Sequence, residues 1–247
     1  MCASCKPNSI TSSLDDGRDA ADEVRSKNNL TQSHGNEGPR YDGIDVSSHQ
    51  GKIDWKKLAY DRTLRFAYIK ATEGATYVSP HYGYNVTRAH RYGLPVGSYH
   101  YMSSKSSVEA QFRNFVSHVN ITSQELIPMI DVEDAGEWTR IQLIDSVRHL
   151  ADLLEAHYGK KPMIYSTMDF YNKYLAPHFN DYPLYIGRYD SRAPRINWQG
   201  TYTIWQFSEN GTLPGINAYV DLCRFAEGRD IEDIALKTPR ADYAHAD

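Results

Sequence analysis

The sequence predicts an α/β protein, a modified TIM-like barrel with five β/α units followed by three strands with few or no helices. From residue 41 onward, short apolar runs alternate with helical patterns, and this alternation is typical of parallel βαβ units. After residue 167 the apolar runs continue, while their connections become rich in Pro, Gly and Asn. Eight strands with five helical crossovers suit a closed barrel.

The first half of the barrel is predicted from four strand–helix pairs. The expected strands cover residues 41–47, 65–74, 94–102 and 125–133, and the expected helices cover 53–61, 80–93, 106–119 and 140–159. Gly93 ends the second helix and Gly159 the fourth, because glycine adopts the backbone conformation that closes a helix. The fourth helix has the clearest pattern, with an apolar face formed by Leu143, Val147, Leu150 and Leu154.

Two sequence features predict the helix over 106–119, namely a capping residue at its start and an apolar stripe along one face. Ser106 and Glu109 have the spacing of a capping box, and the apolar stripe consists of Val108, Phe112, Phe115 and Val119. The second half of the barrel then follows with a fifth strand over 161–167 and a short helix within 168–179. The last three strands are expected over 182–189, 202–208 and 218–225.

We predict three segments: a flexible polar tail over residues 1–40, the catalytic barrel domain over 41–230 and a C-terminal extension over 231–247. The tail is rich in Ser, Asn, Asp and Gly, so it cannot bury enough apolar surface to offset the entropy of ordering. The net charge of −4 and the absence of a basic run argue against nucleic-acid binding. No apolar run approaches the length of a transmembrane helix, and we expect a monomer.

The cysteines do not form a disulfide framework. Cys2 and Cys5 make a lone Cys-x-x-Cys in the polar tail, which is a weak metal or redox signal, and Cys223 lies in an apolar run where a small core residue is expected. No export signal is visible in this chain. Cys2 followed by a polar tail resembles the start of a mature bacterial lipoprotein with an added Met, so lipid anchoring at Cys2 is a hypothesis.

Acidic residues gather where the predicted strands end. Asp131 and Glu133 end the fourth strand, Asp45 the first, and Asp221 interrupts the last apolar strand. In a closed barrel the first and last strands are neighbours, and chemistry lies at the carboxyl ends of the strands. Asp131 and Glu133 point the same way, so one carboxylate of this crowded pair should resist ionisation.

Clustered carboxylates serve either metal binding or glycosidic cleavage. A catalytic metal usually recruits histidine as well, and no pairing such as His-Glu-x-x-His is present. A magnesium site built from carboxylates alone stays open at this point. Glycoside hydrolysis needs one protonated acid and one ionised carboxylate, and a crowded acid pair supplies that difference. We expect no cofactor and no metal.

Seven segments together resemble glycoside hydrolase family 25, the Chalaropsis-type lysozymes. The segments occur in the family's order from about residue 41 to residue 226: YDGIDVSSHQGKIDW, FAYIKATEG, GLPVGSYHY, PMIDVED, IYST, TIWQFS and VDLCRF. The resemblance implies a barrel of five β/α units and three further strands. It also implies hydrolysis of the β-1,4 bond between N-acetylmuramic acid and N-acetylglucosamine in the glycan strands of peptidoglycan.

By this resemblance Glu133 is the proton donor, Asp131 is the first acid of the Asp-x-Glu motif, and Asp45 and Asp221 are the other catalytic carboxylates. A proton donor stays protonated through burial or through a neighbouring negative charge, and Asp131 is the nearest candidate for that charge. Substrate assistance by the N-acetyl group, with retention and with Asp131 orienting that group, is favoured over a covalent enzyme intermediate. Family members often carry Asn where this chain has Cys223. That departure affects the lining of the last strand and leaves the acid in place.

Six further residues are candidates for contacts with the substrate. Tyr99, Tyr101, Tyr165 and Trp205 fall at strand ends in the matched segments, and Lys70 and His100 are polar candidates. The tyrosine-rich composition, 19 Tyr against 7 Phe, suits a cleft lined for sugars as well as half-buried positions. Ordinary core packing is the alternative for each aromatic residue.

Two other functions stay open. One is a different barrel enzyme, a chitinase or a metal-dependent polysaccharide deacetylase, and the other is a non-catalytic cell-wall-binding protein on the same scaffold. PMIDVED lacks the longer Asp-rich run of the chitinase-like pattern. Because peptidoglycan lies outside the cytoplasm, the expected location is extracellular or the cell envelope.

Overall fold

The structure, a computed structural model, describes residues 40–61 and 63–236. The predicted tail with Cys2 and Cys5 lies outside the described residues, as does the end of the predicted extension after residue 236. Within the described ranges, no helix combines the length and apolar character needed to cross a membrane.

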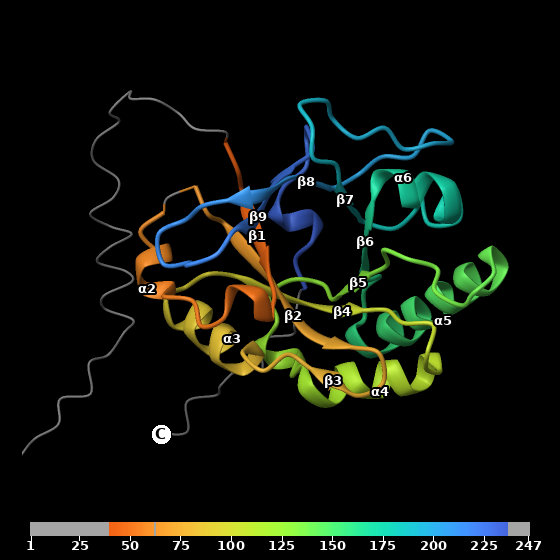
Figure 1. Cartoon of the computed structure of the whole chain (residues 1–247), viewed down its shortest axis with the longest axis horizontal. Helices are drawn as coiled ribbons and strands as arrows, with labels where there is room; N and C mark the ends of the chain where they lie inside the picture. The colour runs from red at the N-terminus through yellow and green to blue at the C-terminus, as the bar shows by residue number, and fades with distance from the viewer. Residues whose placement is uncertain (1–39, 62, 237–247) are drawn as a thin grey trace, which may run out of the picture.

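Eight strands form one closed barrel (Figure 1). In order around the ring they are β1 (Gly43–Val46), β2 (Phe66–Glu73), β4 (Val96–Tyr101), β5 (Met129–Asp131), β6 (Met163–Thr167), β7 (Leu184–Gly187), β8 (Ile204–Gly211) and β9 (Val220–Phe225). The ring closes because β1 pairs with both β2 and β9. The two-residue strand β3 (Tyr77–Val78) adds to β2 as a short antiparallel edge. The predicted fold class is confirmed.

Helices follow the first five barrel strands. They are α2 (Trp55–Leu58), α3 (Tyr82–Arg91), α4 (Val108–His118), α5 (Arg140–Tyr158) and α6 (Met168–Phe170), the last of which continues as a π-helix over Tyr171–Leu175. Short 3-10 helices cover Ser48–Gln50, Ile121–Ser123 and Ile231–Asp233. In Figure 1, α3, α4 and α5 lie along the outside of the strands that precede or follow them. No helix stands between β7 and β8 or between β8 and β9 in the described residues.

The last strand runs against its neighbours. β9 is antiparallel to both β8 and β1, whereas the other neighbouring pairs of the ring are parallel. A parallel partner would need a long crossover, but only residues 212–219 separate β8 from β9. The short connection therefore forces the reversal, and the beginning of β9 lies at the same end of the barrel as the carboxyl ends of the other strands.

Two helix signals behave as expected and one does not. Gly159 follows α5 with a left-handed φ of 74°, and the predicted apolar face of α5 is buried. The cap of α4, however, is Ser107, whose side chain accepts a hydrogen bond from the Ala110 N–H. The predicted capping box of Ser106 and Glu109 was therefore wrong by one residue, because Ser107 is the last extended residue before the helix.

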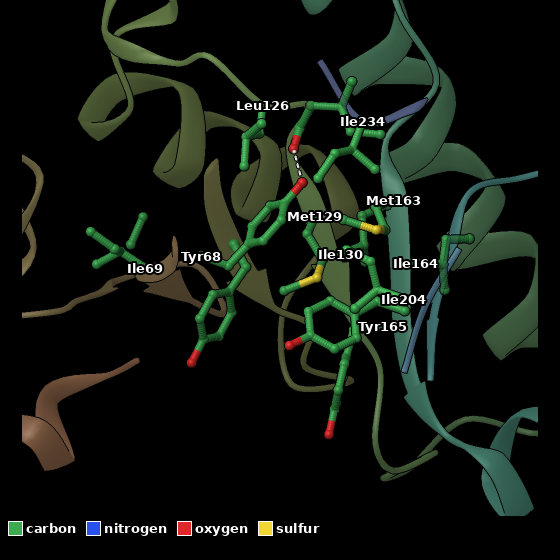
Figure 2. Close-up of a cluster of buried hydrophobic side chains, with 14 of the residues drawn as sticks. Tyr68, Ile69, Leu126, Met129, Ile130, Met163, Ile164, Tyr165, Ile204 and Ile234 are labelled. Carbon is green, nitrogen blue, oxygen red and sulfur yellow. Dashed lines mark hydrogen bonds between the residues drawn. The ribbon is translucent and has the colours of Figure 1, made fainter. Parts of the chain in front are cut away.

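Apolar side chains close the end of the barrel opposite the carboxyl ends of the parallel strands (Figure 2). Tyr68 is fully buried there and donates a hydrogen bond to the Ile127 carbonyl at 3.0 Å. Ile234 and Leu236 are buried as well, and the Leu236 N–H donates to the Glu125 carbonyl at 2.7 Å. The packed structure thus continues beyond residue 230, where the barrel domain was predicted to end.

Candidate active site

Four carboxylates meet at the open end of the barrel. Asp45 lies on β1, Asp131 is the last residue of β5, and Glu133 follows two residues later. Asp221 is the second residue of β9, and the reversed direction of that strand brings it to the same end. Asp45 and Asp221 are directly paired across the β1–β9 ladder. Three stretches of backbone, at β1, β5 and β9, therefore bring the four predicted acids together around one mouth.

A buried hydrogen-bond network holds Asp45. Its Oδ2 accepts from the Tyr185 hydroxyl at 2.6 Å and from Gln206 Nε2 at 2.8 Å. Gln206 Oε1 in turn accepts from the hydroxyls of Tyr165 at 2.6 Å and Tyr189 at 2.7 Å. Of these residues only Tyr165 was a sequence candidate. The available signal for Tyr185 and Gln206 was a polar group inside an apolar strand, on the face that points into the barrel.

Burial and mutual repulsion raise the pKa values of the Asp45–Asp221 pair. The pKa of Asp221 rises to about 8, because the site is desolvated and the charge of Asp45 lies beside it. Burial also raises the pKa of Asp45, but the hydrogen bonds from Tyr185 and Gln206 oppose that rise. Two adjacent carboxylates do not both ionise readily in a poorly solvated place. The pair therefore holds a proton near neutral pH.

Asp131 and Glu133 occupy unlike positions. Asp131 is 6% exposed, and its Oδ1 has no hydrogen-bond partner among the described residues. Glu133 is exposed at the mouth. Burial raises the pKa of Asp131 well above its usual value, and the charge of Glu133 adds to this rise. Asp131 thus carries a buried acceptor oxygen that no described protein group satisfies.

The pKa of Glu133 is raised by burial and by a different charge from the one predicted. Although the residue as a whole is exposed, its carboxyl group is partly shielded from water, and this desolvation is the largest cause. The charge of Asp45 adds to it, whereas the side-chain hydrogen bond with Asp131 lowers this pKa. The expectation that Asp131 supplies the charge that keeps Glu133 protonated is therefore corrected in favour of Asp45. The spacing along β5 favoured Asp131, the nearest acid in sequence. The closed barrel, however, brings the charge of Asp45 on β1 close to Glu133.

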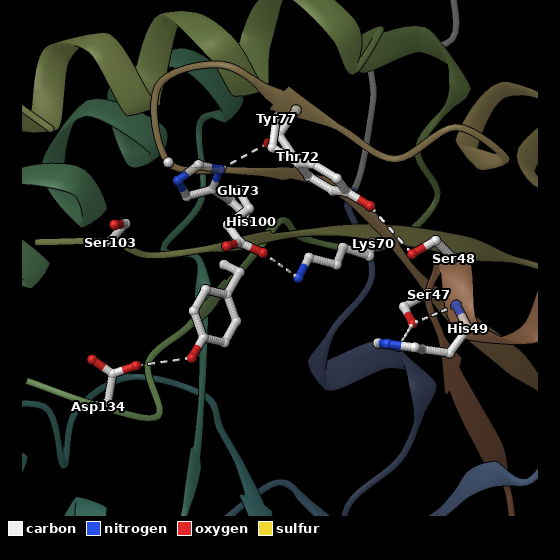
Figure 3. Close-up of polar contacts among 12 residues, drawn as sticks. Ser47, Ser48, His49, Lys70, Thr72, Glu73, Tyr77, His100, Ser103 and Asp134 are labelled. Carbon is white, nitrogen blue, oxygen red and sulfur yellow. Dashed lines mark hydrogen bonds and ion pairs between the residues drawn. The ribbon is translucent and has the colours of Figure 1, made fainter. Parts of the chain in front are cut away.

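Lys70 and Tyr101 lie at the rim of the same mouth. The Lys70 ammonium pairs with Glu73 Oε2 at 2.8 Å and lies 4.6 Å from the centroid of the Tyr101 ring. The Tyr101 hydroxyl donates to Asp134 Oδ2 at 3.0 Å (Figure 3). Lys70 also lowers the pKa of Asp131 and of Glu133 through its positive charge. These contacts place both predicted residues beside the acids.

Tyr99 and Tyr165 stand deeper in the mouth. Both side chains are almost fully buried. Burial is the main reason that their pKa values lie well above the usual range, and the charges of Asp45 and Asp131 contribute to both shifts. The rings of Tyr99 and Tyr165 therefore line the inner wall of the barrel close to the four acids.

Comparison with known proteins identifies the family. The family model described as "Glycosyl hydrolases family 25" matches residues 44–216, which include Asp45, Asp131 and Glu133. The chain belongs to glycosyl hydrolase family 25. It is therefore a glycoside hydrolase, and the resemblance found in its motifs is confirmed.

Relatives and solved structures agree with this family-25 assignment. The chain is 38% identical over 183 residues to the Escherichia coli K12 protein named "Uncharacterized protein YegX", with 72% of this chain and 67% of that protein covered. It is 32% identical to the "Autolytic lysozyme" of Clostridium acetobutylicum, covering 75% of this chain and 56% of that protein. A family 25 glycosyl hydrolase structure from Bacillus anthracis superposes with a TM-score of 0.71 at 31% identity, covering 83% of this chain and 98% of that one.

Two predicted contact residues of this family-25 hydrolase lie apart from the acids. His100 is fully buried, with Nδ1 2.8 Å from Thr72 Oγ1 and Nε2 3.2 Å from Gln111 Oε1. Figure 3 shows its ring turned toward Thr72. Burial lowers the pKa of His100 to about 4. A bulge in β2 between Lys70 and Thr72 explains the arrangement, because it turns Thr72 to the face on which His100 lies.

Trp205 also points away from the mouth. Its neighbour Gln206 reaches Asp45, and successive strand residues face opposite sides. The Trp205 indole N–H donates to the Arg188 carbonyl at 2.7 Å, and the Arg224 guanidinium lies 4.3 Å from its ring centroid. Trp205 therefore packs on the outside of the barrel.

Within residues 40–61 and 63–236, no group of three or more His, Cys, Asp or Glu side chains has an arrangement that could hold a metal ion. Cys223 is buried on the inner face of β9 and unpaired among the described cysteines. Its thiol is near Tyr185, and burial raises its pKa well above the usual value. Cys223 therefore serves as packing beside the Asp45 network.

Proposed function

We propose that this family-25 hydrolase cleaves the β-1,4 bond between N-acetylmuramic acid and N-acetylglucosamine in peptidoglycan, with Glu133 as the proton donor. One observation carries this assignment: of the acids at the mouth, Glu133 is an exposed one whose pKa is nevertheless raised. An acid that donates a proton must hold it at the working pH and must reach the leaving oxygen. The autolytic lysozyme among the relatives supports the substrate class.

Asp131 acts on the substrate from behind Glu133. Its buried Oδ1 lacks a partner among the described residues, and an unsatisfied buried acceptor gains from any donor that a ligand brings. The N–H of the substrate's acetamido group is such a donor. Asp131 would hold that group so that its carbonyl oxygen attacks the anomeric carbon while the glycosidic bond breaks and Glu133 protonates the leaving oxygen. Water then attacks the same carbon and opens the cyclic intermediate, returning a proton to Glu133, and the two inversions give retention of configuration.

Asp45 and Asp221 support the reaction through charge and shape. The negative charge of Asp45 raises the pKa of Glu133 and therefore favours the protonated donor. Tyr99, Tyr101, Tyr165 and Lys70 border the space in front of the acids. A tyrosine presents a flat apolar ring and a hydroxyl, a combination that suits the mixed surface of a sugar.

Replacement of the proposed proton donor tests this function. Glu133→Gln keeps the size of the side chain but cannot donate the proton, so release of reducing ends from purified peptidoglycan should fall by roughly 10²–10⁴-fold. The matched control is Glu137→Gln, which changes an exposed acid on the same loop and should cleave at the wild-type rate. A folded Glu133→Gln variant with near wild-type cleavage would contradict the assignment.

The substrate also bears on location. Because peptidoglycan lies outside the cytoplasm, the enzyme acts in the cell envelope or outside the cell. Lipid anchoring at Cys2 remains a hypothesis about a residue outside the described part of the chain. Mass spectrometry of the native protein decides it, since an unmodified Cys2 excludes a lipoprotein.

A further inference from the structure

One oxygen of Asp45 receives two hydrogen bonds from buried donors. Tyr185 and Gln206, 0% and 2% exposed, both donate to Oδ2, at 2.6 and 2.8 Å. Asp221, the other acid of the pair, lies directly across the ladder and shares a hydrogen bond with the same carboxyl group. Donors that favour a charged carboxylate lower its pKa relative to a neighbour without them.

The Gln206 amide presents Nε2 to Asp45 and its oxygen to two tyrosines, whose hydroxyls could accept as well as donate, so the contact with Asp45 is the one that distinguishes the two amide orientations. Oε1 accepts from Tyr165 and Tyr189 at 2.6 and 2.7 Å. If the amide were rotated by 180°, Oε1 would face Asp45 Oδ2 at about the same distance, and two acceptors would meet unless Asp45 carried a proton. The orientation of this amide and the protonation state of Asp45 are thus coupled.

We propose that Gln206 is a positioning residue that keeps Asp45 ionised, so that the proton of the Asp45–Asp221 pair resides on Asp221. This inference rests on the proposed function, because it concerns how the same site is charged for catalysis. Gln206 does not need to touch the substrate. It acts through Asp45, whose charge in turn favours the protonated state of Glu133.

Space for the network depends on a glycine. A Cβ atom added to Gly187 would lie 2.9 Å from the Tyr165 hydroxyl, 3.1 Å from Gln206 Oε1 and 3.3 Å from the Tyr189 hydroxyl. These three atoms are the Gln206 amide oxygen and the two hydroxyls that donate to it. A side chain at position 187 would therefore crowd this part of the network.

The electrostatics of the pair agree with the geometry. The pKa of Asp221 is raised to about 8 by burial and by the charge of Asp45. At Asp45 the bonds from Tyr185 and Gln206 act against the effect of burial. No donor in the described part of the chain lowers the pKa of Asp221 in the same way, so the proton is more stable there.

The first test removes the donor. Gln206→Leu should raise the pKa of Asp45, and the acid limb of the kcat/KM profile on peptidoglycan should move to higher pH by about one unit. The value of kcat should fall by about tenfold or more while KM changes little. Gln111→Leu is the matched control, because Gln111 is a buried amide whose hydrogen bonds within the described part of the chain go to His100, Ser103 and Ser106 and not to the four acids. It should lower the melting temperature without moving the acid limb.

The second test replaces the Gln206 amide with a group that can donate a hydrogen bond to Asp45 only at low pH. In Gln206→Glu the introduced carboxyl can donate to Asp45 only while it is protonated, so activity should be retained at acid pH and lost as that group ionises. Gln206→Leu should show no such recovery at acid pH. An acid limb that stays at the wild-type pH in both variants would overturn the proposal.

A readout independent of catalysis separates this proposal from the proposed function. Carbon-13 NMR titration of the labelled carboxyl groups should show Asp45 ionised and Asp221 protonated at pH 6 in the wild-type chain, with the Asp45 titration moved upward in Gln206→Leu. The opposite protonation pattern overturns the proposal even if peptidoglycan is cleaved. If Gln206→Leu does not fold, Tyr185→Phe serves instead, because it removes the other donor to Asp45. It should also raise the pKa of Asp45 in the titration. A pKa that does not move would overturn the proposal that the two donors keep Asp45 ionised.

Discussion

Asp45 is the carboxylate whose charge reaches the rest of the site. It raises the pKa of Asp131, Glu133 and Asp221. Because Asp45 is buried on β1 between Tyr185 and Gln206, its position is fixed more firmly than that of the exposed Glu133. At the scale of single residues, the site thus combines the charge of Asp45, held in one position, with the exposed acid Glu133, whose side chain is less restrained.

This arrangement predicts the effect of Asp45→Asn. Removal of a negative charge lowers the pKa of Glu133, and the donor then loses its proton at lower pH. The alkaline limb of the pH–rate profile should therefore shift to lower pH by about one unit, with a smaller loss of maximal rate than in Glu133→Gln. The profile of initial rates on peptidoglycan measures the shift. An alkaline limb that stays in place or moves to higher pH contradicts the role of Asp45, and Asp61→Asn, remote from the four acids, is the control.

At the scale of elements, α5 shows how a helix outside the barrel contributes stability without chemistry. Thr139 accepts a hydrogen bond from the Gln142 N–H, and the Gln142 side chain accepts one from the Thr139 N–H. Thr139→Ala should lower the free energy of unfolding by about 1 kcal/mol. Chemical denaturation measures this loss, and Thr139→Ser should retain most of the stability. A change in kcat at saturating substrate would show that α5 does more than support the barrel.

The strands also show what the sequence could and could not predict. The eight apolar runs and the four acids followed from composition and from the rule that chemistry lies at strand ends, and the structure brings those acids together. The predictions that His100 and Trp205 contact the substrate were wrong. The direction of a strand side chain depends on the alternation of the strand and on bulges, and the apolar pattern does not reveal either one. Tyr185 and Gln206 were missed because their partner, Asp45, is on a strand distant in sequence.

At the scale of the whole molecule, the strands that close the described barrel all lie from β1 onward. The first of them begins at Gly43, and Leu236 is the last buried residue that the structure describes. A chain that begins at Arg40 should therefore fold and keep its specific activity. Its melting temperature should stay within the roughly 2–4 °C that correspond to 1 kcal/mol in a chain of this size. A large fall in activity or melting temperature would place a necessary element before Arg40.

Activity should also be independent of divalent cations. The proposed steps are proton donation by Glu133 and orientation of the acetamido group by Asp131, and neither requires a bound cation. Incubation with a chelator should leave the rate of peptidoglycan cleavage unchanged. A loss that a divalent ion reverses would favour the metal-dependent deacetylase instead, and product masses would then show loss of acetyl groups.

The pairing of β1 with β9 has a consequence for biosynthesis. Asp45 comes from the first strand and Asp221 from the last, so the ribosome makes one half of this acid pair early and the other near the end. While the chain is still being synthesised, Asp45 lacks both Asp221 and the Gln206 donor of β8. The catalytic site of such a hydrolase is complete only after its last strand has been synthesised and has paired with the first. Catalytic activity therefore indicates that the barrel has closed.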